Sequence, residues 1–340
     1  MRRGLLTAVN GLSALRDFLR ALVVGDAAGP YTDRAAAALA VLEDRRLAAV
    51  LAGDLSLAGG RADDRSLASG RGEKWSLLTL ARYDHLLRGR LREGLETVRA
   101  VLSELDVYIS VGNLAAANGW TYAVAMPPEE NVVMATGLRH PAVPNAVGNW
   151  IGLHRNGNML FLTGANMAGK STYMKAVGIA VYLAHMGFPL AVDKMAFSVR
   201  DGLFSSINVA DDLSQGHSHF YAEVLRVKNV AQAVSEGRRL VVLFDELFKG
   251  TNVKDAYDGT LAVTEAFSTY RRCAFIISTH IVEAGEVLRS RDNLRFAYLP
   301  TVLENGRPSY PYTLEEGIAA DRVGMMIIEN EKIIDIITQH

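Results

Sequence analysis

The stretch of this chain with the clearest chemistry is Gly164-Ala-Asn-Met-Ala-Gly-Lys-Ser171, which fits the pattern G-x-x-x-x-G-K-[ST]. It lies between an apolar segment, 159–162, and a segment with a helical pattern, 172–185. In that context, backbone N–H groups and a helix N-terminus can surround a phosphate. Lys170 is expected to reach the β- and γ-phosphates of ATP, and Ser171 to ligate Mg²⁺. The predicted cofactor-binding residues are Gly164, Ala165, Asn166, Met167, Ala168, Gly169, Lys170, Ser171 and Thr172. The alternative is a glycine-rich turn that binds nothing.

Hydrolysis needs a metal partner and a group that orients water, and an acidic pair could supply both. Asp245 and Glu246 follow the apolar run 240–244, at the expected carboxyl end of a strand. We expect Asp245 to hold Mg²⁺ through water and Glu246 to polarise the attacking water as general base. The alternative is a solvated acidic strand end.

A third polar group follows the apolar run 275–277, where the chain reads Ser278-Thr279-His280. His280 is predicted to sense the γ-phosphate or to steady the attacking water. The alternative is a structural histidine.

The composition is that of an ordinary globular protein, with 49% hydrophobic and 21% charged residues and a net charge of -1. It excludes a whole-chain basic bias, so any DNA contact requires a local patch. The lone Cys273 excludes an internal disulfide and fits a reducing, cytoplasmic setting. We see no apolar run of the ~20 residues that a membrane helix requires. A membrane partner is therefore not expected.

The fold class predicted from the pattern is an α/β P-loop NTPase preceded by an all-α domain. The expected domains are a helical domain (1–106), a connector of short extended pieces (107–150) and the ATPase domain (151–340). Short apolar runs alternating with helical segments after residue 158 predict a mostly parallel sheet with flanking helices. Asn305-Gly306 predicts a hairpin between 296–299 and 310–313, and a helix is expected over 325–337. The arginines at 82, 88, 90, 92 and 99 indicate either a solvated charged face or a DNA-contacting stripe.

Four motifs in order resemble the MutS family. They are the phosphate loop with its Asn166-Met167 pair, the segment 211–223, the segment 245–252 followed by Asp258-Gly259, and Ser278-Thr279-His280. An Arg139-His140-Pro141 element also resembles the family, and the helical domain 1–106 looks like the family's lever and core helices. The resemblance implies an ABC-type ATPase that closes as a homodimer over two nucleotides, with DNA as a partner. It implies that Ser218 and Gly216 reach the γ-phosphate across the interface and that Asn252 contacts the partner's site. An ordinary helix cap is the alternative for Ser218.

Three features depart from the family's pattern. Phe248-Lys249 stands where the family has Gly-Arg, which puts a bidentate role for an arginine there in doubt. Ala146 replaces an aromatic residue that packs on adenine in the family. No Phe-x-Glu wedge is visible, so we expect a short MutS-related ATPase without the mismatch-recognition domain.

The leading hypothesis is a DNA-associated ATPase, in mismatch repair or recombination, whose ATP-driven dimer closure moves the helical arm. The alternative is a nucleotide-gated scaffold or clamp that acts on a protein partner. A transporter motor is disfavoured by the Asn-Met phosphate loop.

Overall fold

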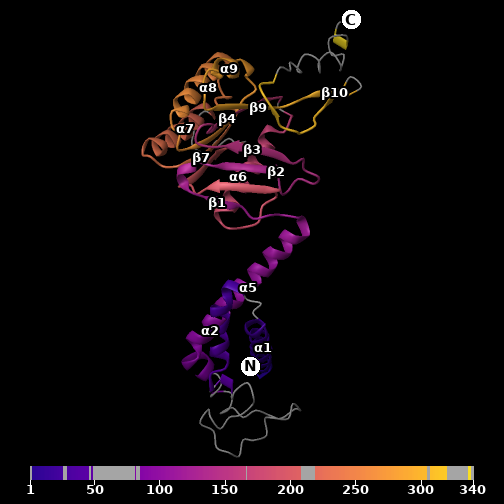
Figure 1. The fold of residues 1–340 in the computed structure, drawn as a ribbon, viewed down its shortest axis with the longest axis vertical. Coiled ribbons are helices and arrows are strands. Elements are labelled where there is room, and N and C mark those ends of the chain that lie inside the picture. Colours follow the sequence, from indigo (N-terminus) through magenta and orange to yellow (C-terminus); the bar gives the residue numbers. More distant parts are fainter. Residues whose placement is uncertain are drawn as a thin grey trace, which may run out of the picture. The chain divides into compact units, whose positions relative to one another are not determined.

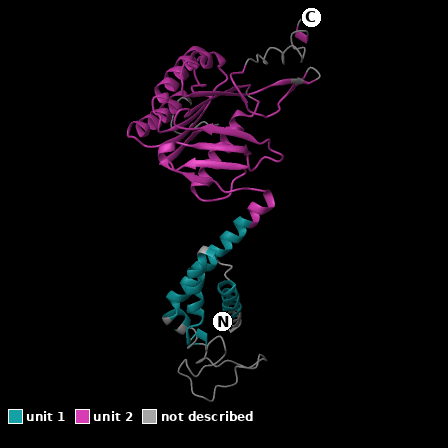
Figure 2. Ribbon diagram, viewed as in Figure 1, with its two compact units in different colours: residues 1–112 teal, residues 113–340 magenta. Residues whose placement is uncertain are grey.

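The computed structural model describes residues 2–25, 29–45, 47–48, 81, 85–165, 167–207, 219–304, 307–319 and 336–337. The chain divides into two compact units, residues 1–112 and 113–340 (Figure 2). The first is helical where it is described, and the second combines strands with helices (Figure 1).

The helical unit contains α1 (Arg2–Val24), the 3₁₀ turn η1 (Gly29–Tyr31), α2 (Thr32–Leu42), the π-helical turn η4 (Leu86–Arg90) and most of α5 (Arg92–Asn118). Its buried core includes Leu19, Leu39 and Leu42 from the first two long helices and Val98 and Val101 from α5. Leu91, Leu95, Leu102 and Leu105 pack against this core. The three- and four-residue spacing of these positions places them on one face of the helix.

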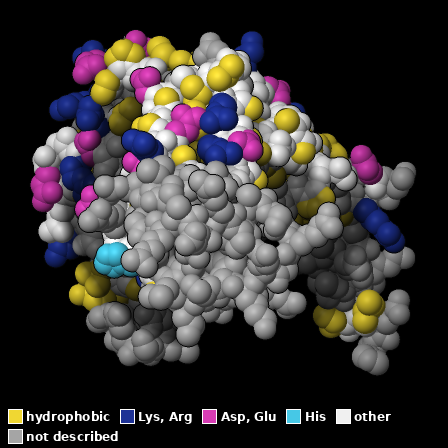
Figure 3. Space-filling view, turned by 90° about the horizontal axis from the view of Figure 1, so that it is seen from below, with side chains coloured by type: hydrophobic (Ala, Val, Ile, Leu, Met, Phe, Trp, Pro, Cys, Tyr) yellow, Lys and Arg dark blue, Asp and Glu magenta, His cyan; other side chains and the backbone are white. Residues whose placement is uncertain are grey.

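Charged residues of the helical unit pair with one another. Arg20 contacts Glu43, Arg34 contacts Glu104 at 2.6 Å, and Arg99 contacts Glu96 at 2.7 Å. On the face shown in Figure 3, basic and acidic side chains are interspersed. Of the five arginines considered above as a possible DNA-contacting stripe, Arg82 lies outside the described residues. The arrangement resembles a solvated, mixed-charge surface more than a continuous basic stripe.

Helix α5 departs from the expected connector. It continues to Asn118, so residues 107–118 are helical rather than short extended pieces. Gly112 lies within the helix, because a single glycine there costs only ~1 kcal/mol and does not end it. Of the described helices, only α5 is long and apolar enough to cross a membrane. This is weak evidence for a membrane span, because it rests on length and composition alone. The domain limits at 106 and 150 stay a prediction.

A six-stranded sheet forms the centre of the second unit, in the order β12-β9-β4-β8-β7-β6. Its strands are β4 (Met159–Gly164), β6 (Gly202–Ser206), β7 (Leu240–Asp245), β8 (Ala274–Ser278), β9 (Leu294–Leu299) and β12 (Glu315–Glu316). The strands β6, β7, β8, β4 and β9 pair in parallel, and β12 pairs antiparallel to β9. The carboxyl ends of the five parallel strands therefore share one edge of the sheet.

Helices cover both faces of this sheet (Figure 1). In β4, Leu160 and Leu162 join one core with α6 (Lys170–His185), whereas Met159 and Phe161 join a second core. The second core contains residues of α7 (His219–Ser235), α8 (Val253–Ser268) and α9 (Val282–Leu288). Successive side chains of a strand point to opposite faces, so strands buried on both sides read as continuous apolar runs.

A second sheet packs its inner face on the α6 side, in the order β1-β5-β2-β3. Its strands are β1 (Val124–Met126), β5 (Lys194–Ser198), β2 (Val133–Leu138) and β3 (Asn149–Leu153). Two of these strands, β1 and β2, lie within the expected connector, and β3 begins in it, so the connector contributes structure to the second unit.

The hairpin predicted around Asn305-Gly306 is formed by other strands than those expected. Its arms are β10 (Val302–Glu304) and β11 (Arg307–Ser309), paired antiparallel. Residues 296–299 belong to β9 instead, which pairs with β4 and buries Ala297 and Leu299 in the central sheet. Most of the helix expected over 325–337 lies outside the described residues.

Candidate nucleotide site

The glycine-rich loop connects β4 to α6 at the carboxyl edge of the central sheet. Gly164 and Gly169 have φ angles of 136° and 100°, in a region that side-chain-bearing residues rarely adopt. A Cβ at Gly164 would lie 2.7 Å from the carbonyl oxygen of Leu299, and one at Gly169 would lie 3.1 Å from the Tyr312 ring. Both glycines are therefore required by backbone conformation and by close packing.

Lys170 begins α6 and is only 1% exposed. Its ammonium group donates hydrogen bonds to the carbonyl oxygens of Gly164 at 2.8 Å and Ala165 at 3.1 Å. Among the described residues, the nearest carboxylate is that of Glu246, 3.8 Å away. Burial lowers the pKa of Lys170, although Glu246 and Asp245 act in the opposite direction. A buried ammonium this distant from its counter-ion suits an anionic ligand.

The acidic pair lies beside the loop, where β7 ends next to β8. Asp245 is opposite Ser278 in the strand register and accepts a hydrogen bond from the Ser278 hydroxyl. The N–H group of Glu246 donates to the Ser278 carbonyl oxygen at 3.1 Å. These bonds fix the backbone of the pair against β8. The Glu246 backbone has a φ of 54°, a conformation uncommon for residues other than glycine.

Three cationic or potentially cationic groups surround the Glu246 carboxylate at similar distances. Lys170 Nζ and Lys249 Nζ lie 3.8 Å from its oxygens, and His280 Nδ1 lies 3.9 Å away. The Glu246 side chain is 17% exposed, while His280 is 50% exposed. The structure thus brings Lys170, Glu246 and His280 together at one edge, as expected from three separate motifs.

The residues present fit a magnesium ion. Ser171 is in the first turn of α6, and Asp245 supplies the carboxylate at the end of β7. Among the described residues, no group of three or more His, Cys, Asp or Glu side chains could hold a metal. One hydroxyl and one carboxylate, with phosphate and water completing the shell, is the kind of set that Mg²⁺ uses.

Phe248 is a second strained position in the loop that follows the acidic pair. Its φ is 63°, and its N–H donates to Glu223 Oε1 of α7 at 2.7 Å. Its ring packs edge-on against Phe220, with ring centres 5.9 Å apart. The cost of a left-handed residue, ~1–2 kcal/mol, is offset by these contacts. This replacement of the family's glycine connects the acidic loop to α7.

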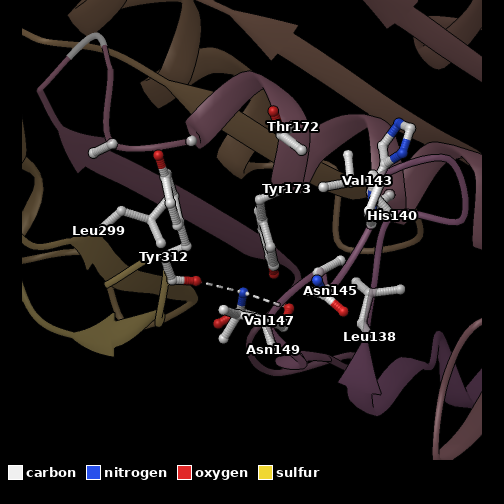
Figure 4. A pocket seen from close by; sticks show the side chains of 15 residues that line it. Leu138, His140, Val143, Asn145, Val147, Asn149, Thr172, Tyr173, Leu299 and Tyr312 are labelled. Carbon is white, nitrogen blue, oxygen red and sulfur yellow. Dashed lines mark hydrogen bonds between the residues drawn. The ribbon is translucent and has the colours of Figure 1, made fainter. Parts of the chain in front are cut away.

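A cavity of about 340 Å³ adjoins the loop and is lined by Gly169, Thr172 and Tyr173 of the loop–helix segment. Ala146 and Tyr312 line it too, and Figure 4 shows the Tyr312 ring beside the cavity. Asn149 donates to the Tyr312 carbonyl oxygen at 2.9 Å and accepts from the Leu314 N–H at 2.7 Å.

The sequence pattern does not predict Tyr312 at the site. It predicts that 310–313 forms an arm of the hairpin, and no local signal places an aromatic ring at the cavity that Ala146 lines. The structure therefore puts an aromatic residue at the cavity from a different part of the chain.

Of the remaining predicted site residues, some are described by the structure and others lie outside the described residues. Met167 is 70% exposed and Ala168 is buried. Asn252 caps α8, because its side-chain oxygen accepts the Asp255 N–H at 2.9 Å. Asn166, Gly216 and Ser218 lie outside the described residues. The roles of Asn252 and Ser218 at an interface stay predictions.

A strand–loop–helix with a buried lysine, beside an acidic pair at the end of a nearby parallel strand, defines the chain as a P-loop protein of the α/β class. Residues 160–339, more than half of the chain, match MutS domain V. The chain therefore belongs to the MutS family and carries the C-terminal domain that is the ATPase domain of that family.

Two similar proteins are both described as DNA mismatch repair protein MutS. The one from Geobacillus kaustophilus (strain HTA426) is 29% identical over 241 residues, which are 69% of this chain and 26% of the relative. The one from Shouchella clausii (strain KSM-K16) is 31% identical over 241 residues, covering 69% of this chain and 27% of the relative. The chain thus spans roughly a quarter of the length of these relatives.

Proposed function

We propose that this protein binds and hydrolyses ATP with Mg²⁺ at the edge where β4, β7 and β8 end. The observation that carries the proposal is the buried Lys170 ammonium, 3.8 Å from a carboxylate that is itself positioned by β8. Membership of the MutS family at domain V supports the same activity.

Each residue has a separate role in this proposal. Lys170 and the loop N–H groups bind the phosphates, while Ser171 and Asp245 hold Mg²⁺, which when bound offsets phosphate charge. Glu246 accepts the proton of the attacking water as general base. His280 orients this water or the γ-phosphate. Lys249, at 3.8 Å, places a further positive charge beside the Glu246 carboxylate.

The 340 Å³ cavity holds the nucleotide base in this proposal. It begins at Gly169 and Thr172, so it lies next to the phosphate loop. Tyr312 supplies an aromatic face there, in place of the aromatic residue that Ala146 replaces.

DNA association, homodimer closure and a cytoplasmic location are the finer parts of the proposal. DNA association is supported by the two relatives described above, which are named for DNA mismatch repair. In the closed dimer, Ser218, Gly216 and Asn252 would approach the nucleotide held by the partner. A nucleotide-gated scaffold for a protein partner is the second candidate, favoured by the paired charges of the helical unit, such as Arg34 with Glu104 and Arg99 with Glu96.

The substitution Glu246→Gln tests the ATPase. It keeps the side-chain shape but removes the base, so we expect ATP turnover to fall roughly 100-fold or more while ATP affinity is retained. Steady-state hydrolysis and equilibrium binding of ATP measure the two effects. Glu236→Gln, an exposed position directly after α7, is the matched control. Undiminished hydrolysis by the Glu246 variant would exclude the proposed mechanism.

Hydrolysis measured with homoduplex, mismatched, branched and single-stranded DNA separates the two candidates. A rate changed by one form of DNA supports the DNA-associated ATPase. A rate indifferent to all of them favours the scaffold and leaves the ATPase itself in place.

A further inference from the structure

The opposite edge of the central sheet carries a second polar cavity, which we call the arginine cup. It has a volume of about 280 Å³ and lies where the parallel strands begin, a strand length of roughly 20 Å from the phosphate loop. Its lining residues are Pro128, Glu129, Asn131, Arg155, Arg239, Arg271 and Arg272. Four guanidinium groups from three separate turns therefore converge on one small cavity.

Two of these arginines are fixed by ion pairs. Arg239 forms a two-pronged contact with Asp201, with nitrogen–oxygen distances of 2.9 and 3.2 Å. Arg271 contacts Asp292 at 2.7 Å. These bonds hold the pKa of Asp201 at about 2 and keep that of Asp292 below its usual range. Both carboxylates are thus ionised at neutral pH and committed to their arginines.

The other two, Arg155 and Arg272, are exposed, and neither makes an ion pair with any described residue. Arg155 lies in the turn before β4, and Arg272 in the turn before β8. Their guanidinium groups present planar sets of N–H donors, which match the oxygens of a phosphate group.

A further cation lies directly behind the cup. Arg200 is only 8% exposed and donates to the side-chain oxygen of Asn131 and, at 3.2 Å, to the carbonyl oxygen of Arg272. Among the described residues, its Nε has no hydrogen-bond partner and no carboxylate lies within ion-pair distance of it. A buried cation with no counter-ion in the described part of the chain adds to the positive potential of the cup.

The charges around the cup do not balance. Five arginines, including Arg200, face three carboxylates, those of Glu129, Asp201 and Asp292. The chain as a whole carries a net charge of -1, so this excess is a local feature. Local clusters of this kind, rather than global charge, bind phosphates.

We propose that the arginine cup binds a backbone phosphate of a nucleic acid. The cup offers guanidinium groups, one carboxylate, one amide and one proline, and it has no extended apolar wall for a base or an acyl chain. It therefore takes a phosphate that is part of a longer polymer, without reading base sequence. This inference rests on the proposed DNA association and gives that association a contact surface on the ATPase unit.

Charge reversal at the two unpaired arginines tests the proposal. The double variant Arg155→Glu/Arg272→Glu is compared with Lys228→Glu/Arg307→Glu, an exposed pair outside the cup with the same change in net charge. Binding to a 20-base-pair duplex without a mismatch is followed by fluorescence anisotropy across a salt series. ADP is present at saturation, so that the phosphate loop is filled.

The cup is proposed to hold one backbone phosphate, and each phosphate contact contributes about 0.9 to the slope of log affinity against log salt, so the cup variant should lose about 0.9 from this slope. The corresponding loss of affinity is roughly fivefold at 0.15 M salt. The control pair should change the slope by much less. Arg155→Lys/Arg272→Lys, which retains the charges, should keep most of the affinity.

Equal losses in the cup variant and in the control pair would overturn the proposal, because overall charge would then explain the binding. Duplex binding that survives in the cup variant would place the DNA contact elsewhere and leave the proposed function standing. Absence of duplex binding in the unmodified protein would overturn both DNA statements. ATP hydrolysis without DNA, which the cup variant should retain, shows in each case whether the fold and the ATPase are intact.

Discussion

The two edges of the central sheet each bury a cation, and the comparison shows how a cation beside the proposed nucleotide site differs from one that connects chain segments. Lys170 is 1% exposed and Arg200 is 8% exposed. Burial lowers the pKa of both, to about 10 for Arg200. Lys170 has two loop carbonyl partners and a carboxylate 3.8 Å away. Arg200 instead donates to Asn131, Val132 and Arg272, and so connects its own segment to residues 131–132 and to the turn before β8.

The largest expected effect in this comparison is on nucleotide binding at the carboxyl edge. Lys170→Met retains the length of the side chain but removes its charge. Because hydrogen bonds to charged groups contribute about 1.5–3 kcal/mol, ATP affinity should fall roughly tenfold to 100-fold, measured by calorimetry. The free energy of unfolding should change by less than about 1 kcal/mol, since removing the buried charge offsets the lost carbonyl contacts.

Lys175→Met, at an exposed position of the same helix, is the control for this substitution and should bind ATP normally. ATP affinity that survives in the Lys170 variant would mean that the buried ammonium is structural. Lys170 and Arg200 would then both be structural cations, and the contrast between the two edges would not hold.

The carboxyl edge could be predicted from the sequence to a large extent. Gly164, Glu246 and His280 each come shortly after a continuous apolar run, and the loop that begins at Gly164 leads to Lys170. Parallel strands bring such positions to one edge. The structure places Lys170 and His280 each within 4 Å of the Glu246 carboxylate. At this edge, the motifs in the sequence and the strand order of the sheet place the same residues together.

The amino edge and the base cavity could not be predicted in the same way. Arg155, Arg239 and Arg272 are separated along the chain and belong to no motif, and only the strand order β4-β8-β7 brings them together. Tyr312 reaches the cavity because Asn149 binds its backbone from a distant strand. Both depend on long-range contacts, which periodicity and spacing do not reveal. The left-handed Phe248 likewise depends on its partner Phe220.

The second expected effect is on stability at the amino edge. Arg200→Met leaves the Asn131 side-chain oxygen and two backbone carbonyl groups without this donor in a buried region. The free energy of unfolding in urea should therefore fall by roughly 2–3 kcal/mol, whereas ATP affinity should stay unchanged. Arg238→Met, at an exposed neighbouring position, should have little effect. If the free energy of unfolding of the Arg200 variant were unaltered, Arg200 would not stabilise the fold, and its contrast with Lys170 would be weaker.

The smallest expected effect concerns the base cavity beside the phosphate loop. Tyr312→Ala removes an aromatic face worth about 0.5–1.5 kcal/mol, so ATP affinity should fall roughly twofold to tenfold. Tyr312→Phe keeps the ring and should bind ATP almost normally. The hydrogen bond from Asn149 goes to the backbone carbonyl oxygen of Tyr312, so this substitution retains it. Inorganic triphosphate lacks a base, so its affinity should be the same in all three proteins. If the alanine variant instead lost triphosphate and ATP affinity equally, Tyr312 would act by packing its ring against Gly169 of the phosphate loop, and not on the base.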